Sequence, residues 1–292
     1  MAKVTANGVD IYYEEHGSGE PLLLIMGWGG NAATWHPQVP GLAERFRVIA
    51  FDNRGVGRTS APEGPYTIGQ MAADAAGLIE ELGLPWAHVF GISMGGMIAQ
   101  ELALTHPERV GALILGCTTP GGRQAAGVDQ LHSDIDGFRQ KSDNGDADLE
   151  WFSEFLRRLW TDAALAKSGS HLQDFVLSFI RFPPSSHGLQ HQVDAVSSHD
   201  SYDRLHQIGH ATLVITGEDD TLIDPRNSAI LAERIPGAEL HVFAGLRHAF
   251  HLERPDLVNS VIIDFIERAG RYPAERNGAR ATEVGASPPA GG

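Results

Sequence analysis

Ser93 lies at the centre of a Gly-x-Ser-x-Gly pattern, between an apolar β-type run at 88–92 and a helix-compatible segment at 95–105. This strand–turn–helix context is typical of a nucleophile elbow, a turn that holds a serine hydroxyl clear of the sheet. We expect Gly91 and Gly95 to let the backbone turn sharply there. The pattern alone is weak evidence, because a chain with 34 glycines can match it by chance. The groups that activate a serine must therefore be sought elsewhere in the chain.

Two residues later in the chain supply the missing chemistry. A serine hydroxyl is a poor nucleophile at neutral pH, and it needs an imidazole to take its proton and a carboxylate to orient that ring. Asp220 follows a strand-like run at 213–216, and His248 follows another at 239–243. We therefore predict a catalytic triad in which Ser93 is the nucleophile, His248 the base and Asp220 the orienting acid.

The sequence leaves alternatives for both partners of the serine. Asp219 and Asp224 lie in the same turn as Asp220, and either carboxylate could orient the ring instead. His251 is an alternative to His248, because it lies in the same loop-to-helix segment.

Strand-like and helix-like runs alternate over most of the chain. A hairpin is predicted at 4–6 and 9–16, because Asn-Gly at 7–8 is the signal of a type I′ turn. A helix is predicted at 68–82, with Gly83 as its C-terminal cap. Buried parallel strands are predicted at the apolar runs 22–26, 48–51, 88–92, 110–116, 213–216 and 239–243. This alternation predicts an α/β fold with a mostly parallel sheet flanked by helices.

The strand pattern stops between about residues 119 and 205, where aromatic residues recur at helical spacing. We predict a helical lid here, inserted after the sixth strand, whose apolar faces pack on the core or line a substrate cavity. Three lid aromatics are predicted to contact substrate: Trp151, Phe155 and Phe179. Two lid histidines are weaker candidates for the same role: His191 and His199. The predicted domain boundaries are 1–118 and 206–270 for the core, 119–205 for the lid and 271–292 for a disordered tail.

The composition narrows the class of protein. The 292 residues carry a formal net charge of −15 and no cluster of lysine and arginine, which argues against nucleic-acid binding. No apolar run is long enough to span a membrane and no signal peptide is recognisable, so we expect a cytoplasmic protein that binds no membrane. The single cysteine, Cys117, is expected to be a small buried hydrophobe at a strand end. No metal or organic cofactor is implied, and the sequence leaves the oligomeric state open, including a homo-oligomer.

Three segments together resemble the α/β-hydrolase superfamily, in particular its esterase, lactonase and cofactor-free perhydrolase group. They are the elbow GISMGGMIAQELALTHPERV, the acid turn GEDDTLIDP and the histidine segment GLRHAFHLERP, and the resemblance extends from Tyr12 to Ala269. It implies the order serine, acid, histidine. The family pattern Gly-x-x-Asp, counted from Gly217, selects Asp220, and the distance to the Glu-x-Pro at 253–255 selects His248.

The resemblance also implies an oxyanion hole at the glycine-rich loop 26–30, after the third strand. We predict that the backbone amides of Trp28 and Met94 bind the oxyanion; an ordinary turn is the alternative. The chain departs from the usual family pattern at two places. A Met-Gly pair at 26–27 replaces the usual His-Gly, as in some methyl esterases that act on polyketides. Arg247 replaces a glycine before the base, and we expect it to face solvent.

The leading hypothesis is a serine hydrolase that cleaves a carboxylic ester or lactone of a small to medium hydrophobic substrate. A cofactor-free perhydrolase or haloperoxidase is the second hypothesis, suggested by Trp28 in the oxyanion loop and Met94 beside the nucleophile. A ligand-sensing protein on the same fold is the third, because a fold does not fix a function.

Overall fold

A computed structural model describes residues 2–127, 129–130, 133, 137 and 149–270; the predicted tail 271–292 lies outside these residues. Eight strands form one sheet in the order β1-β2-β4-β3-β5-β6-β7-β8. Their bounds are β1 Ala2–Ala6, β2 Val9–His16, β3 Glu20–Ile25, β4 Phe46–Phe51, β5 Ala87–Ile92, β6 Val110–Gly116, β7 Thr212–Gly217 and β8 Glu239–Phe243. Strands β3 to β8 pair in parallel, while β2 pairs antiparallel with both β1 and β4. The predicted hairpin is present, and Asn7 and Gly8 have φ of 49° and 74°, as a type I′ turn requires.

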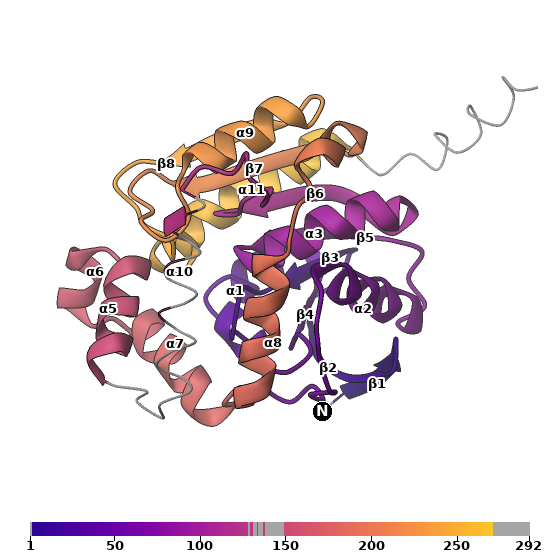
Figure 1. Ribbon diagram of the computed structural model, residues 1–292. Helices are drawn as coiled ribbons and strands as arrows, with labels where there is room; N and C mark the ends of the chain where they lie inside the picture. Colours follow the sequence, from indigo (N-terminus) through magenta and orange to yellow (C-terminus); the bar gives the residue numbers. More distant parts are fainter. Residues whose placement is uncertain (1, 128, 131–132, 134–136, 138–148, 271–292) are drawn as a thin grey trace, which may run out of the picture.

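Helices cover both faces of the sheet (Figure 1). The helices that pack on one face are α2 (Ile68–Glu81), α3 (Met94–Thr105) and α9 (Arg226–Arg234); those on the other are α1 (Val39–Leu42) and α11 (Pro255–Ala269). The short elements are η1 (Ala32–Trp35), η2 (Pro107–Arg109), η3 (Tyr202–Gln207) and α10 (Phe250–Glu253). This arrangement confirms the predicted fold class.

Local sequence signals fix the ends of α2. The Thr67 side chain accepts the Gln70 amide, while the Gln70 side chain accepts the Thr67 amide, which forms a capping box. At the other end, Gly83 has φ of 69°, a conformation that glycine adopts without strain. The helix predicted at 68–82 is therefore confirmed.

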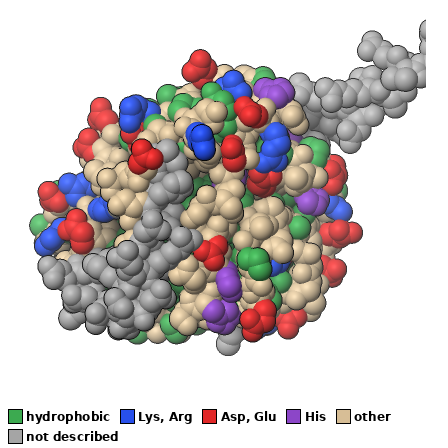
Figure 2. Space-filling model, in the orientation of Figure 1, with side chains coloured by type: hydrophobic (Ala, Val, Ile, Leu, Met, Phe, Trp, Pro, Cys, Tyr) green, Lys and Arg blue, Asp and Glu red, His purple; other side chains and the backbone are tan. Residues whose placement is uncertain are grey.

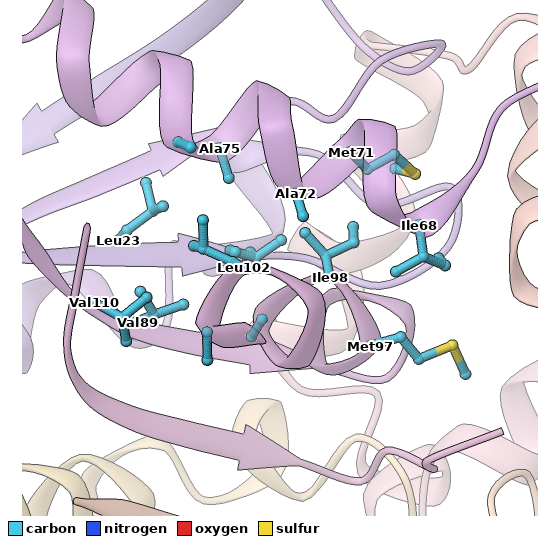
Figure 3. Packing of buried hydrophobic residues seen from close by; sticks show 14 of the residues in the cluster. Leu23, Ile68, Met71, Ala72, Ala75, Val89, Met97, Ile98, Leu102 and Val110 are labelled. Carbon is cyan, nitrogen blue, oxygen red and sulfur yellow. The ribbon is translucent and has the colours of Figure 1, made fainter. Parts of the chain in front are cut away.

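The core continues on both faces of the sheet. Figure 3 shows α2 and α3 packed on each other and on the strands, with Ala72 and Ala75 of α2 near Ile98 and Leu102 of α3. Small side chains on α2 let the two helices approach closely. A second cluster on the opposite face contains Trp35, Phe90, Ile262 and Phe265. Burial of each large side chain contributes about 1.5–3 kcal/mol, so both layers hold the sheet rigid beneath the site.

In the described part of the chain, the region between β6 and β7 is helical, as predicted for the lid, and it contains α5 (Leu149–Leu159), α6 (Asp162–Lys167), α7 (Ser170–Arg181) and α8 (Ser186–Ser197). Gln192 of α8 connects the lid to the core, because its side chain accepts the Gly29 amide at 3.0 Å and donates to the Arg54 carbonyl at 2.8 Å. The boundaries 119–205 stay a prediction, and part of that range lies outside the described residues.

Two buried ion pairs stabilise the loop after β4. Arg54 donates to both carboxylate oxygens of Asp74 at 2.6 Å, and Asp52 accepts the backbone and side chain of Arg58 at 2.7 to 3.0 Å. Arg54 and Asp74 are both almost inaccessible to solvent. Asp52 and Arg54 therefore have structural roles.

None of the helices in the described part of the chain is long and apolar enough to cross a lipid bilayer. On the face drawn in Figure 2, the basic side chains of the described residues lie among acidic ones and do not gather into one continuous patch.

Removal of the Asp74 carboxylate is expected to be costly. Asp74→Ala leaves the Arg54 guanidinium buried and uncompensated, so we expect the free energy of unfolding to fall by about 3–5 kcal/mol. The half-exposed pair between Glu239 and Arg268 provides the control. Glu239→Ala should change stability little, because solvent screens exposed pairs. Urea denaturation measures both variants, and equal losses would contradict the assignment of a structural role to Asp74.

Candidate active site

Ser93 occupies a strained backbone conformation between β5 and α3, with φ of 56° and ψ of −120°. A positive φ is uncommon outside glycine, and it persists only where the surroundings enforce it. The Ser93 amide donates to Gly116 of β6 at 2.8 Å, and the Ser93 carbonyl accepts the amides of Gly96 and Met97 and the hydroxyl of Thr118. These bonds fix the turn and hold the serine at the carboxyl edge of the sheet.

The two elbow glycines act by a different means from the one predicted. Neither Gly91 nor Gly95 has a positive φ. A Cβ atom on Gly91 would lie 2.2 Å from the Gly95 carbonyl oxygen, and one on Gly95 would lie 2.0 Å from the Ile25 carbonyl oxygen. The glycines therefore permit close backbone approach between β3, β5 and α3, and the torsional strain falls on Ser93 itself.

Asp220 and His248 form a buried hydrogen-bonded pair, with 2.7 Å between Oδ2 and Nδ1. The other carboxylate oxygen accepts the amides of Leu222 and Ile223 at 2.8 and 3.0 Å. The backbone thus orients the carboxylate, and the carboxylate orients the ring.

The alternative acids lie elsewhere. Asp219 is exposed, and Asp224 pairs with Arg226. Neither carboxylate contacts the ring of His248 among the contacts that the structure describes.

The pKa of His248 is raised well above its ordinary value of 6.5. Burial by itself would lower this pKa, but the negative charge of Asp220, the neighbouring Cys117 sulfur and the hydrogen bond to Asp220 together raise it. The ring therefore holds a proton firmly once it has taken one, but it can act as a base only in its neutral form, which predominates above this raised pKa.

His251, the alternative base, is buried in the lining of the same cavity. Burial, followed by the nearby charge of His248, lowers the pKa of His251 to about 3. Neither ring nitrogen has a hydrogen-bond partner within the described part of the chain. His251 is thus a neutral ring that no carboxylate orients.

Ser93 and His248 line one cavity beneath the lid. The other lining residues are Met26, Gly27, Trp28, Gly30, Thr34, Ile92, Phe155, Leu159, Phe175, Phe179, Leu222, Ala249, His251 and Leu252. Among the described residues, no hydrogen bond joins the Ser93 hydroxyl to the His248 ring. Such bonds often tighten only when substrate binds.

The loop after β3 runs directly past the serine. A Cβ atom on Gly27 would lie 3.6 Å from the Ser93 hydroxyl oxygen, so the backbone between Gly27 and Trp28 is close to that oxygen. Met94 is the first residue of α3, and the first amides of a helix have no partner within the helix. A negative oxygen is favoured at this position by the helix dipole. The loop and the helix start could both contribute to an oxyanion hole.

Two of the three lid aromatics that were predicted to contact substrate lie in the lining of the cavity. Phe155 and Phe179 line the cavity, and Phe155 also packs edge-on against the Trp28 ring, with 6.2 Å between ring centroids. Trp151 belongs to α5, but its side chain lies outside what the structure describes. The two lid histidines do not line this cavity: His191 packs on Tyr66, and His199 lies beside Glu101.

Arg247 remains partly exposed, but its guanidinium bonds to the lid, which the sequence did not predict. Its guanidinium donates to the carbonyls of Arg157 and Trp160 and to the carboxylate of Asp162, at 2.7 to 2.9 Å. Glu253, on the other side of His248, accepts the amide and hydroxyl of Thr161 at 2.7 Å. The segment that carries the imidazole is therefore attached to the lid, because the lid offers the free carbonyls and donors that these charged groups need.

Cys117 is a site residue that sequence reasoning missed. It is buried at the end of β6 as predicted, but its Sγ lies 3.8 Å from Nε2 of His248. Its position at a strand end beside the elbow strand is the signal that could have found it. Burial raises the pKa of the Cys117 thiol, although His248 and the Ser93 backbone partly oppose this. Within the described residues, the thiol and the Asp220–His248 pair form a group of metal-ligating atoms within 4.8 Å of one another.

An eight-stranded sheet of this order, a serine on a strained strand-to-helix turn and an acid–imidazole pair after later strands are the features of an α/β hydrolase. The chain also matches the family described as alpha/beta hydrolase fold over residues 20–255. It belongs to this family, and the resemblance drawn from the three sequence segments is confirmed.

Several relatives share most of this chain. It is 32% identical to RutD of Azorhizobium caulinodans, provisionally named a carbamate hydrolase, over 88% of this chain and 94% of the relative. It is also 32% identical to BpoC of Mycobacterium tuberculosis, provisionally named a non-heme bromoperoxidase, over 88% of this chain and 97% of the relative. The enol-lactonase from Burkholderia xenovorans has a similar structure, with a TM-score of 0.79 and 25% identity over 91% of this chain and 100% of that one. The family supports hydrolase activity.

The ionisation of His248 is open to direct measurement. We expect its ring to remain protonated above pH 6.5, because Asp220 raises its pKa. Asp220→Asn removes the opposing charge and leaves burial to dominate, so the pKa should fall below the ordinary value. NMR titration of histidine ring signals, assigned with His248→Asn, tests this, and His251 should stay neutral above pH 5 as an internal reference. A wild-type His248 pKa at or below 6.5 would overturn the explanation.

Proposed function

We propose that the protein is a serine hydrolase that cleaves a carboxylic ester or lactone of a small to medium hydrophobic substrate. The observation that carries the proposal is the 2.7 Å hydrogen bond between Asp220 and His248, in the lining of the same cavity as the strained Ser93. A hydroxyl, an imidazole and a carboxylate converging on one cavity are the set that acyl transfer needs.

In the proposed reaction, Ser93 Oγ attacks the substrate carbonyl carbon while His248 Nε2 takes the hydroxyl proton. Asp220 keeps the other ring nitrogen protonated and stabilises the imidazolium. The amides of Trp28 and Met94 bind the oxygen that becomes negative. His248 then gives the proton to the leaving alcohol, and water, activated by the same ring, hydrolyses the acyl-enzyme.

The lining of the cavity supports a hydrophobic acyl group. Apolar and aromatic side chains dominate it, and no lysine, arginine or carboxylate side chain occurs among its described lining residues. The likeness to an enol-lactonase and to a provisionally named carbamate hydrolase agrees with attack on an acyl carbon, and it leaves ester, lactone and carbamate as substrates to compare.

A burst experiment tests the function. Wild-type protein should release a stoichiometric burst of alcohol from activated short-chain esters and should form a covalent adduct with a fluorophosphonate at Ser93. Ser93→Ala should lose both and retain at most the residual catalysis of binding, a loss of about 10³-fold or more in kcat. Parallel assays with lactones and polyketide methyl esters would define the substrate class. Turnover by Ser93→Ala at the wild-type rate, or no adduct on the wild type, would refute the proposal and favour a ligand-sensing protein.

Perhydrolase or haloperoxidase chemistry is a second candidate, favoured by the 32% identity to BpoC. The same triad would transfer the acyl group to hydrogen peroxide instead of water. Peroxide-dependent bromination of a phenolic dye in acetate buffer, absent in Ser93→Ala, would separate this activity from simple hydrolysis.

The lid aromatics should determine acyl-chain preference. Phe179→Ala removes a ring from the cavity wall, so we expect kcat/KM for hexanoyl esters to fall about tenfold relative to acetyl esters, because lost apolar contact weakens binding of the longer chain. Ile180 is the matched control, since it is the next residue of α7 and is 68% exposed. Ile180→Ala should leave the ratio unchanged, and an equal effect of both variants would exclude a direct contact with substrate.

A further inference from the structure

Cys117 lies on the proton-accepting side of the His248 ring. Nδ1 faces Asp220, and Nε2 faces Cys117 Sγ at 3.8 Å. The thiol also lies within hydrogen-bond distance of the His248 carbonyl oxygen, at 3.5 Å. The proposed reaction gives this buried sulfur no part.

The spacing of sulfur and nitrogen suits two ligands of one metal ion. Zinc binds sulfur at about 2.3 Å and imidazole nitrogen at about 2.0–2.1 Å, so the two ligand atoms of a tetrahedral ion lie about 3.5 Å apart. The observed 3.8 Å is within a few tenths of an ångström of this value.

The His248 ring also has the carboxylate partner that metal-binding histidines usually have. In metal sites, a ligating histidine usually donates its other N–H to a carboxylate, which fixes the ring and strengthens the ligand. Asp220 already accepts such a bond from Nδ1, and its second oxygen is engaged by two backbone amides. Asp220 is therefore suited to act through the ring and not as a direct ligand.

We propose that Cys117 Sγ and His248 Nε2 form a binding site for a thiophilic divalent cation, zinc or cadmium, and that the bound ion inhibits the enzyme. On binding, the thiol and the protonated imidazole each release one proton, and the resulting thiolate and neutral imidazole each donate an electron pair to the ion. Ser93 and His248 line the same cavity, so the serine hydroxyl or water in that cavity would complete the shell. The ion occupies the Nε2 lone pair, so the ring cannot take a proton. Magnesium and calcium prefer oxygen ligands and should bind poorly.

Cadmium titration tests the site directly. Cys117 is the only cysteine of the chain, so any ultraviolet thiolate-to-cadmium absorption must arise from it. We expect one equivalent of this absorption in the full-length wild type and in Ser93→Ala, reversible with EDTA. Cys117→Ser should abolish the band, and His248→Asn, which keeps the thiol, should weaken cadmium binding more than about tenfold, since loss of even an indirect partner costs that much. Magnesium should produce no change.

Inhibition provides the second readout, and it alone rests on the proposed hydrolase function. Zinc should inhibit ester hydrolysis by the wild type, and for Cys117→Ser the inhibition constant, measured against the variant's own rate without zinc, should be more than about tenfold higher. If zinc inhibits both proteins equally, it binds elsewhere and the inhibitory role is refuted. If the absorption band is missing in folded wild-type protein, or persists unchanged in His248→Asn, the site itself is refuted. A band without any esterase activity would support the metal site and count against the proposed function only.

Discussion

The buried hydrogen bond between Asp220 and His248 is the interaction on which the rest of the site depends. It reverses the effect that burial has on the imidazole, as the contrast with His251 shows: burial lowers the pKa of His251 to about 3, whereas Asp220 raises that of His248. A charged pair inside a protein is costly to form. Here two backbone amides donate hydrogen bonds to the Asp220 carboxylate, so its charge is partly compensated and its orientation toward the ring is fixed. The geometry of the acid turn therefore sets both the orientation and the proton affinity of the proposed base.

The sheet supplies a second constraint, because it forces Ser93 into its strained conformation. Hydrogen bonds to β6 and from α3 hold the turn, and glycines beside it let the backbones of β3, β5 and α3 approach closely. The two apolar layers in turn hold the sheet, and Figure 3 shows the layer that contains α2 and α3. Strain at one residue is thus balanced by the packing of the whole core, which is the usual way in which proteins retain a costly backbone conformation.

Hydrogen bonds and apolar contacts join the lid to the segment that carries His248. Arg247 and Glu253 flank the His248 loop and bond to the end of α5 and the start of α6, while Leu159 and Trp160 pack against Leu252. Movement of the lid would therefore act on the segment that carries the imidazole. These bonds therefore join part of the cavity wall to the segment that carries the proposed base.

The sequence by itself determined the fold class, the hairpin and helix α2, because turn signals, capping residues and hydrophobic periodicity act over a few residues. It also singled out Ser93, Asp220 and His248 as candidates, because a strand followed by a chemically distinctive loop can be recognised locally. Three features were decided only by the tertiary structure: the bonds from Arg247 to the lid, the close-approach role of the elbow glycines and the place of Cys117 beside the imidazole. Each depends on which distant backbone or side chain lies opposite, and residues such as Cys117 and His248 are brought together only when the parallel strands align their carboxyl ends.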